Sequence, residues 1–383
     1  MTKRRNRKER PVSRPGDLWL CGADRRVMCG DSTSQEDVEK LMGLRSGKQS
    51  TLLKVYIAPM RHRLLVPGAI LVSFALISCG PLQHDTKETY ILVTANTKIP
   101  YWQEALAGLN RAGSEMKVTV AMVGPNRYDA KAQREDLQTA IHDKPSGILI
   151  SAADPDLVTA DIDSAVQQGI PVLTIDSDAP ASKRLFFIGS DNYRIGRLGG
   201  DLLVKSLGGK GNVVMFTYPR QNNLIERQHG YESAFEGYPN IQVNQAVDVQ
   251  GDPAIAYKTA KQLLNSKAKV DAFVCLEAVA CPQVGDVVSE TNTTGKVTIM
   301  AMDTDRSTLR WIQQGVITAT IAQKPFTMAY LGVKLLDEIH HHMPASLTAH
   351  FAQDSMSRLP SRVDTGTFIV DKQNVSRFME QQR

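Results

Sequence analysis

The sequence predicts an α/β protein of two lobes, each a parallel sheet flanked by helices. Short apolar, β-rich runs alternate with segments of helical period from Thr89 onward. This repeated order of strand, helix and strand is typical of parallel sheets with helices on both faces. About three hundred residues with this many strands exceed one comfortable sheet, so a second lobe is expected.

The individual elements follow from the spacing of apolar residues. Strands are expected at residues 90–94, 118–123, 147–150, 172–175, 212–216, 272–276, 297–302, 318–322 and 367–370. Helices are expected at residues 102–115, 130–142, 157–168, 195–207, 224–235, 254–264 and 328–340.

Residues 60–78 resemble a bacterial secretory signal peptide. Two arginines open the stretch, a Pro-Gly pair interrupts its apolar run, and small residues precede Cys79. The run is shorter than the roughly 20 apolar residues that a membrane-spanning helix needs. Leu76-Ile77-Ser78-Cys79 is similar to the cleavage box of bacterial lipoproteins, which implies that Cys79 is acylated and becomes the mature N-terminus.

Residues 1–59 precede this signal, although a signal peptide normally acts from a free N-terminus. We therefore expect an extraneous segment without a stable fold, with translation beginning at Met60. Its composition, rich in Arg, Lys, Gly and Ser, agrees with this. Residues 16–19, 26–32 and 37–42 resemble a fragment of certain DNA methyltransferases, but no Asp-Pro-Pro-Tyr motif follows. A nucleic-acid-binding arm is the alternative, because Lys and Arg cluster in residues 3–10.

The net charge of +5 does not indicate a nucleic-acid partner for the mature part of the chain. Residues 1–59 carry +6 and the arginines of the signal add two, which leaves about −3 for the remainder. Net charge bears on nonspecific binding to nucleic acid, and here the positive charge lies outside the mature part.

Cys275 and Cys281 are the cysteines left in the mature part besides Cys79. A disulfide requires Cα atoms about 4.4 to 6.8 Å apart, so a bridge and two buried thiols both stay open. His340, His341 and His342 are interpreted as a solvated helix end. Because no zinc-type spacing of Cys and His is present, neither a metal site nor a cofactor is expected.

Polar side chains follow the ends of five expected strands. They are Asn96, Asp176, Glu277, Asp303 and Gln323. Ligands of such sheets bind outside the carboxyl ends of the strands. An acidic residue after a strand is often a helix N-cap, so each alone is ambiguous. Together they predict a polyhydroxylated ligand, because carboxylates and amides can each accept two hydrogen bonds from neighbouring hydroxyls.

Aromatic side chains and an arginine complete the expected site. Tyr101 and Trp102 stand after the first expected strand, where aromatic faces can contact the C–H patches of a sugar. The alternative is that Trp102 packs inside the protein. Arg227 presents a fork of donors that suits vicinal hydroxyls. Its alternative is a surface salt bridge.

Residues 89–339 resemble the periplasmic sugar-binding proteins of the ribose-binding type that serve ATP-driven importers. The matching stretches are residues 99–102, 170–176, 189–192, 226–230, 302–303 and 320–325. The resemblance implies that the ligand stacks on Tyr101 and Trp102 and forms hydrogen bonds with Asp176, Arg227, Asp303 and Gln323. Ser177 and Leu276 replace an arginine and an asparagine of ribose binders, so the implied ligand is a sugar or polyol other than ribose.

The resemblance also implies three crossovers between the lobes and closure by hinge bending. They are expected near Asp191, at residues 323–325 and between residues 343 and 366. Residues 79–88 form a tether. The N-terminal lobe comprises residues 89–191 and 325–345, and the C-terminal lobe comprises residues 192–324 and 366–383.

The implied function is that of a periplasmic, monomeric substrate-binding lipoprotein, anchored to a membrane at Cys79, which delivers its ligand to the permease of an ABC importer. No enzyme is expected, since no nucleophile elbow, zinc signature or phosphate-binding loop is present. One alternative is a sugar-sensing subunit for a membrane receptor kinase. Another is a sugar-responsive transcription repressor, which would need a helix-turn-helix that residues 1–59 do not show.

Overall fold

The computed structural model describes residues 17–20, 26–29, 85, 87–344, 351, 354, 356–357 and 359–381. The chain forms two compact units, Met1–Gly80 and Pro81–Arg383. In the first unit, β1 (Asp17–Leu20) and β2 (Arg26–Cys29) pair antiparallel. An isolated pair of strands is at best marginally stable. This pair therefore does not show a stable fold, and the expectation that residues 1–59 lack one stays a prediction. The expected signal peptide and Cys79 lie outside the described residues.

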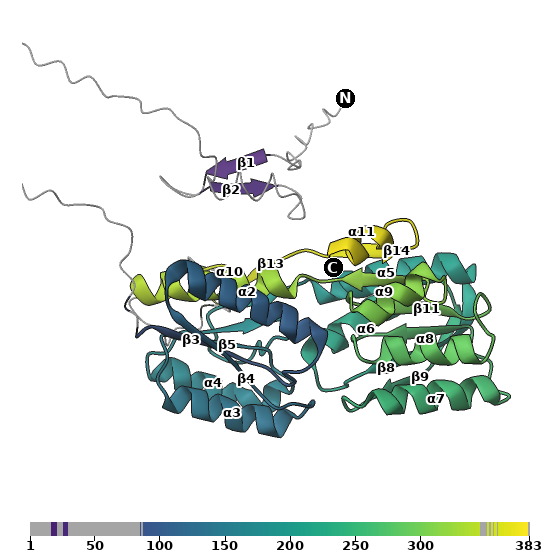
Figure 1. The fold of residues 1–383 in the computed structure, drawn as a ribbon, viewed down its shortest axis with the longest axis horizontal. Helices are drawn as coiled ribbons and strands as arrows, with labels where there is room; N and C mark the ends of the chain where they lie inside the picture. The colour runs from purple at the N-terminus through teal and green to yellow at the C-terminus, as the bar shows by residue number, and fades with distance from the viewer. Residues whose placement is uncertain are drawn as a thin grey trace, which may run out of the picture. The chain divides into compact units, whose positions relative to one another are not determined.

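The first lobe of the second unit is a six-stranded parallel sheet with helices on both faces (Figure 1). Helices α2 (Pro100–Met116) and α10 (Pro325–His341) pack together on one face, and α3 (Ala130–His142) and α4 (Pro155–Gln167) on the other. The strands, in spatial order, are β4 (Thr119–Val123), β3 (Thr89–Val93), β5 (Gly147–Ile150), β6 (Val172–Ile175), β7 (Phe187–Gly189) and β13 (Arg362–Asp364).

The second lobe repeats this arrangement with one antiparallel edge strand. Its strands, in spatial order, are β9 (Asn240–Asp248), β8 (Lys210–Thr217), β10 (Ala272–Cys275), β11 (Thr298–Met302), β12 (Ala319–Ala322) and the antiparallel β14 (Phe368–Asp371). Its helices are α5 (Asn192–Leu207), α6 (Asn222–Phe235), α7 (Pro253–Asn265), α8 (Ala280–Glu290), α9 (Arg306–Gln313) and α11 (Val375–Gln381). Helices α5 and α6 pack against each other, and α11 packs against α9.

The chain crosses between the two sheets three times, as the sequence predicted. The first crossing follows β7 at residues 190–191 and the second follows β12 at residues 323–324. The third is the short link between β13 and β14, at residues 365–367. Because β13 pairs with β7, the first lobe continues to residue 364, beyond the expected limit of 345.

Aspartate and proline fix several helix starts. Asp154 and Asp252 accept backbone N–H groups of the first turn of α4 and α7, and a proline follows each of them at the first helical position. Because the aspartate and the proline fix where each helix begins, the loop between the preceding strand and the helix is short. Short loops bring the ends of the strands close to the groups that the helices carry.

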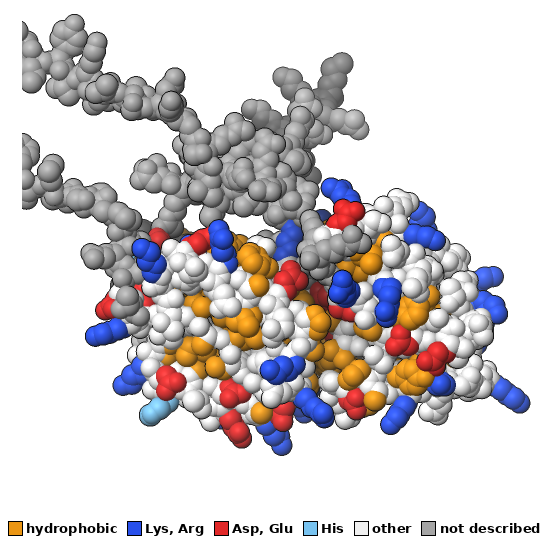
Figure 2. All heavy atoms as spheres, in the orientation of Figure 1, with side chains coloured by type: hydrophobic (Ala, Val, Ile, Leu, Met, Phe, Trp, Pro, Cys, Tyr) orange, Lys and Arg blue, Asp and Glu red, His pale blue; other side chains and the backbone are white. Residues whose placement is uncertain are grey.

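Charged side chains of both signs are interspersed on the face shown in Figure 2. This mixture fits the small net charge of residues 64–383, which is about −3. Within the described part of the chain, no helix is both long and apolar enough to cross a membrane. Cys275 and Cys281 are buried free thiols, so the disulfide alternative is not adopted.

Candidate ligand-binding site

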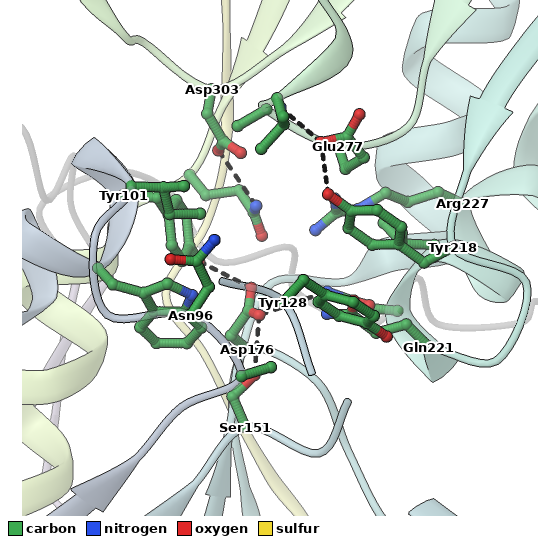
Figure 3. Close-up of a pocket in the computed structure, with 18 residues that line it drawn as sticks. Asn96, Tyr101, Tyr128, Ser151, Asp176, Tyr218, Gln221, Arg227, Glu277 and Asp303 are labelled. Atoms are coloured by element: carbon green, nitrogen blue, oxygen red, sulfur yellow. Dashed lines mark hydrogen bonds between the residues drawn. The ribbon is translucent and has the colours of Figure 1, made fainter. Parts of the chain in front are cut away.

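One cleft is lined by all eight residues that the sequence singled out for ligand binding. Figure 3 shows side chains of both lobes pointing toward one another there. The expected members are Asn96, Tyr101, Trp102, Asp176, Arg227, Glu277, Asp303 and Gln323. Further polar or aromatic members, which the sequence analysis missed, are Tyr128, Ser151, Tyr218, Gln221 and Asn223.

Asp176 and Asp303 line the cleft and share the same left-handed backbone conformation at the end of a strand. Each follows the last residue of a central strand, and each has a φ of 62°. Their backbone N–H groups still donate to the neighbouring strand, at the carbonyls of Ile188 and Ile321. Left-handed backbone is uncommon outside glycine, although aspartate tolerates it. Neither side chain caps a helix, so the N-cap interpretation does not apply to these two residues.

Asp176 is held by donors from both lobes. Its Oδ1 accepts the Tyr101 hydroxyl at 2.7 Å, and its Oδ2 accepts Ser151 Oγ at 3.1 Å. Asn223 of the second lobe donates to the same Oδ2 at 3.4 Å. Burial raises the pKa of Asp176, while Arg227 and these donors act in the opposite direction. A carboxylate has about four acceptor sites, so one more donor can still be accepted.

Arg227 is buried in the cleft wall with only 2% of its surface exposed, which excludes the surface salt bridge. Its Nε donates to Asn192 Oδ1 at 2.9 Å, and its Nη1 donates to the Leu276 carbonyl at 2.7 Å. These two bonds fix the guanidinium plane. Its Nη2 is buried without a partner. The arginine therefore presents one oriented, unused donor.

Buried amide oxygens of the cleft also lack partners. They belong to Gln221, Asn223 and Gln323. Asn223 and Gln323 donate through nitrogen to Asp176 and Asp303, so their amide orientations are fixed. An unpaired buried polar atom costs about 1 to 3 kcal/mol. A ligand that brings several donors and an acceptor, as hydroxyl groups do, would satisfy these atoms and Arg227 Nη2 together.

Glu277 is partly committed to its own helix. Its Oε1 accepts the Ala280 N–H at 2.8 Å, and its Oε2 accepts the Val279 N–H and the Tyr218 hydroxyl. Glu277 is not the N-cap of α8, which is Val279, but its carboxylate accepts the N–H groups of Val279 and Ala280 at the start of this helix. Asn96 is likewise engaged, since its Oδ1 accepts the Lys98 N–H at 2.9 Å.

Burial raises the pKa of Glu277 and of Asp303 to about 7. For Glu277, backbone N–H groups, Tyr218 and Arg227 oppose this rise. For Asp303, Arg227 and Gln323 oppose it and the Asp176 charge adds to it. The cleft thus holds two carboxyl groups that titrate near neutral pH.

We expect the ligand-free protein to lose stability through these two groups as the pH rises from about 4 to about 7. Between the unfolded and the folded pKa the folded protein binds more protons than the unfolded chain, so the free energy of unfolding falls as pH rises. Urea unfolding at pH 5 and pH 7.5 should show a smaller loss in the double variant Glu277→Gln, Asp303→Asn than in the wild type. An equal loss in both proteins would contradict this assignment.

Aromatic rings stand on both sides of the cleft. Tyr101 and Trp102 meet edge to face, with centroids 5.1 Å apart. Trp102 is 6% exposed and belongs to the core of the first lobe, so its packing alternative holds for most of the ring. Tyr128 of the first lobe stacks on Tyr218 of the second at 4.5 Å. This stack closes one side of the cleft.

An ion pair adds a third contact between the lobes. Arg220 Nη1 of the second lobe lies 3.1 Å from Asp154 Oδ2 of the first. The arginine is largely exposed, so the pair contributes little stability by itself. Together with the Tyr128–Tyr218 stack and the Asn223–Asp176 bond, it defines a closed arrangement of the lobes.

Some of the missed cleft residues carry a signal in the sequence and others do not. Ser151 directly follows an expected strand and Tyr218 comes two residues after another, so the strand-end rule already applied to other residues would have found them. Asn223 lies four residues before Arg227 on α6 and therefore shares its helix face. Tyr128 and Gln221 lie in loops and carry no such signal.

Comparison with known proteins places the chain in one family. The family model described as a periplasmic binding protein domain matches residues 90–340, a range that contains all eight expected cleft residues. The chain belongs to this family. A curated relative of the periplasmic binding protein family is the ribose import binding protein of Haemophilus influenzae, 25% identical over 284 residues, 73% of this chain and 94% of the relative.

Solved periplasmic binding proteins show the same architecture. The sugar-binding protein of a sugar ABC transporter from Bacillus halodurans is 34% identical, with a TM-score of 0.67, covering 76% of this chain and 100% of that one. The solute-binding protein of an ABC transporter from Burkholderia graminis, solved in complex with D-arabinose, is 26% identical with a TM-score of 0.69. It covers 76% of this chain and 98% of its own. These relatives are binding proteins of transporters rather than enzymes, as expected for this chain.

Proposed function

We propose that this chain is the substrate-binding component of an ABC importer and captures a sugar or polyol between its lobes. The observation that carries the proposal is the set of oriented, unpartnered polar atoms in the cleft, with Arg227 Nη2 as donor and the Asn223 and Gln323 oxygens as acceptors. A ligand hydroxyl can donate and accept at once, so neighbouring hydroxyls suit this mixed set. The sugar-binding relatives support the same assignment.

Ligand capture is coupled to closure of the lobes. Asp176 belongs to the first lobe and Arg227 to the second, so a ligand that bonds both favours the closed arrangement. The closed surface is what a permease would recognise, and a lipid anchor at Cys79 would keep the protein at the membrane. An unmodified Cys79 in chain purified from membranes would remove the anchor from this proposal.

A thermal-shift panel tests the proposal directly. The panel contains D-ribose, D-allose, D-arabinose, D-xylose and several polyols, with amino acids as negative controls. We expect at least one sugar or polyol to raise the melting temperature, since a ligand at 100 times its Kd adds about 2.7 kcal/mol of stability. Calorimetric titration then gives the stoichiometry, expected to be one per chain. A panel in which only amino acids raise the melting temperature would contradict the proposal.

A further inference from the structure

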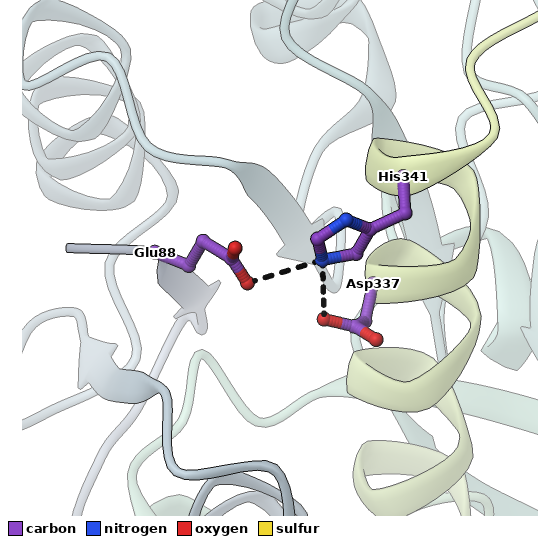
Figure 4. Close-up of side chains that lie close together, drawn as sticks. All are labelled: Glu88, Asp337 and His341. Carbon is purple, nitrogen blue, oxygen red and sulfur yellow. Dashed lines mark hydrogen bonds and ion pairs between the residues drawn. The ribbon is translucent and has the colours of Figure 1, made fainter. Parts of the chain in front are cut away.

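A second cluster of polar side chains lies at the opposite end of the first lobe from the cleft. Glu88 precedes β3, and Asp337 and His341 lie four residues apart on the last turns of α10 (Figure 4). One potential ligand atom from each lies within 4.8 Å of the others. The cleft residues instead follow the carboxyl ends of the strands, so this cluster is separate from the proposed sugar site.

The distances within the cluster fit a shared metal ion as well as hydrogen bonding, because His341 Nε2 and Glu88 Oε2 also lie within hydrogen-bond range at 3.3 Å. The same His341 Nε2 lies 3.3 Å from Glu88 Oε2 and 3.7 Å from Asp337 Oδ1. A contact of 3.7 Å is too long for a hydrogen bond. Two ligand atoms on one tetrahedral zinc ion, with bonds of about 2.0 to 2.2 Å, are separated by about 3.3 to 3.5 Å. The nitrogen is therefore placed between two carboxylates at nearly the spacing that a shared ion imposes.

Burial and charge also favour a divalent cation. Glu88 and Asp337 are 7% and 5% exposed. Buried carboxylates are stabilised by a cation, which is either a charged side chain or a metal ion. A neutral imidazole with carboxylates is a donor set suited to zinc and related transition metals, whereas calcium and magnesium prefer oxygen ligands alone.

Each carboxylate also accepts a hydrogen bond from a neighbouring group. The Asp85 N–H donates to Glu88 Oε1 at 2.8 Å, which leaves Oε2 facing His341. The Tyr90 hydroxyl donates to Asp337 Oδ1 at 3.0 Å. Such outer hydrogen bonds are what orients the ligands of protein metal sites.

We propose that Glu88, Asp337 and His341 bind one zinc-class divalent ion, with water completing its coordination. The ion would tie the start of β3 to the end of α10. Of the three consecutive histidines, His341 is the ligand, which revises the interpretation of all three as a solvated helix end. His340 instead meets Tyr90 edge to face at 6.5 Å, and the exposed His342 faces Glu338 at 3.5 Å.

Calorimetric titration of the chelator-treated full-length chain with ZnCl₂ tests the site without any sugar. His342→Ala is the matched control for His341→Ala, because the two histidines are adjacent at the end of α10 and each lies four residues after a carboxylate. We expect one Zn²⁺ per wild-type chain, an affinity at least tenfold lower in His341→Ala, and unchanged affinity in His342→Ala. Zn²⁺ should raise the melting temperature of the wild type and of His342→Ala, but not that of His341→Ala.

Asp337→Asn is a second test of the site in case His341→Ala does not fold, because asparagine has nearly the same shape as aspartate. It should also weaken Zn²⁺ at least tenfold. Co²⁺ should add visible absorption bands to the wild type and to His342→Ala only. The proposal is overturned if the wild type does not bind Zn²⁺, or if His341→Ala and His342→Ala lose affinity equally. Equal binding of Ca²⁺ by the wild type and by His341→Ala, with no preference for Zn²⁺, would also overturn it.

Discussion

Asp176→Asn is expected to lower affinity for the best sugar of the panel at least tenfold. The carboxylate is buried and accepts Tyr101, Ser151 and Asn223, so it is positioned to take a further hydroxyl from the ligand. A hydrogen bond to a charged group contributes about 1.5 to 3 kcal/mol, and 1.4 kcal/mol is one decade of affinity. Because Asn223 reaches Asp176 from the other lobe, the change also weakens closure.

Asp129→Asn is the matched control for this measurement. Asp129 caps α3 by accepting the Lys131 and Ala132 N–H groups, and asparagine is an equally good cap. Calorimetric titration should give the wild-type Kd for Asp129→Asn. If Asp176→Asn also keeps the wild-type Kd while its melting temperature falls, Asp176 has a structural role only.

Gly196→Ala is expected to destabilise the second lobe and to weaken sugar binding as well. A Cβ at Gly196 would lie 2.0 Å from the Arg227 carbonyl oxygen and 2.8 Å from Gly230 Cα. Both obstacles are backbone atoms of α6, so α5 and α6 must separate. Overpacking of this kind costs about 1 to 3 kcal/mol. Arg227 lies on the displaced turn, so its guanidinium leaves the position fixed by Asn192.

Gly237→Ala provides the control, because a Cβ there meets nothing within 4 Å. Urea unfolding and calorimetric titration of both variants separate the two effects. We expect Gly237→Ala to match the wild type in both measurements. Gly196→Ala with an unchanged unfolding midpoint would show that the two helices can separate at no cost, contrary to the contact distances.

The central strands were predictable because they are short continuous apolar runs, and the long helices because their apolar residues recur at the helical period. Strands β5, β6 and β10 are buried along their whole length, and α3 has the predicted bounds. Three missed elements, β9, β7 and α8, lack this signal, whereas α9 (Arg306–Gln313) was missed although its buried residues lie on one face. Strand β9 lies at a sheet edge and is mostly exposed or half-buried, and β7 has only three residues. Helix α8 contains Pro282 and Gly285, which hide its period.

The cleft was predictable where the position of a residue depends on its own strand. Asp176, Asp303 and Gln323 each follow a strand, and parallel strands bring their carboxyl ends to one edge. Tyr128 could not be found in this way, because it reaches the cleft by stacking on a ring of the other lobe. Glu88 was equally hidden, since its neighbour His341 is 253 positions away along the chain.

The three crossings impose an order on biosynthesis. The first lobe needs α10 to cover its sheet and β13 to complete its edge, and both are made after the central strands of the second lobe. Folding from the N-terminus, which is the usual course during synthesis, cannot finish this lobe. A nascent chain that has emerged only to β12 has α2 but not α10 on one sheet face of the first lobe, so that apolar face is only partly covered. Such a chain would depend on a holding chaperone until its last sixth is made, and its two lobes would mature nearly together.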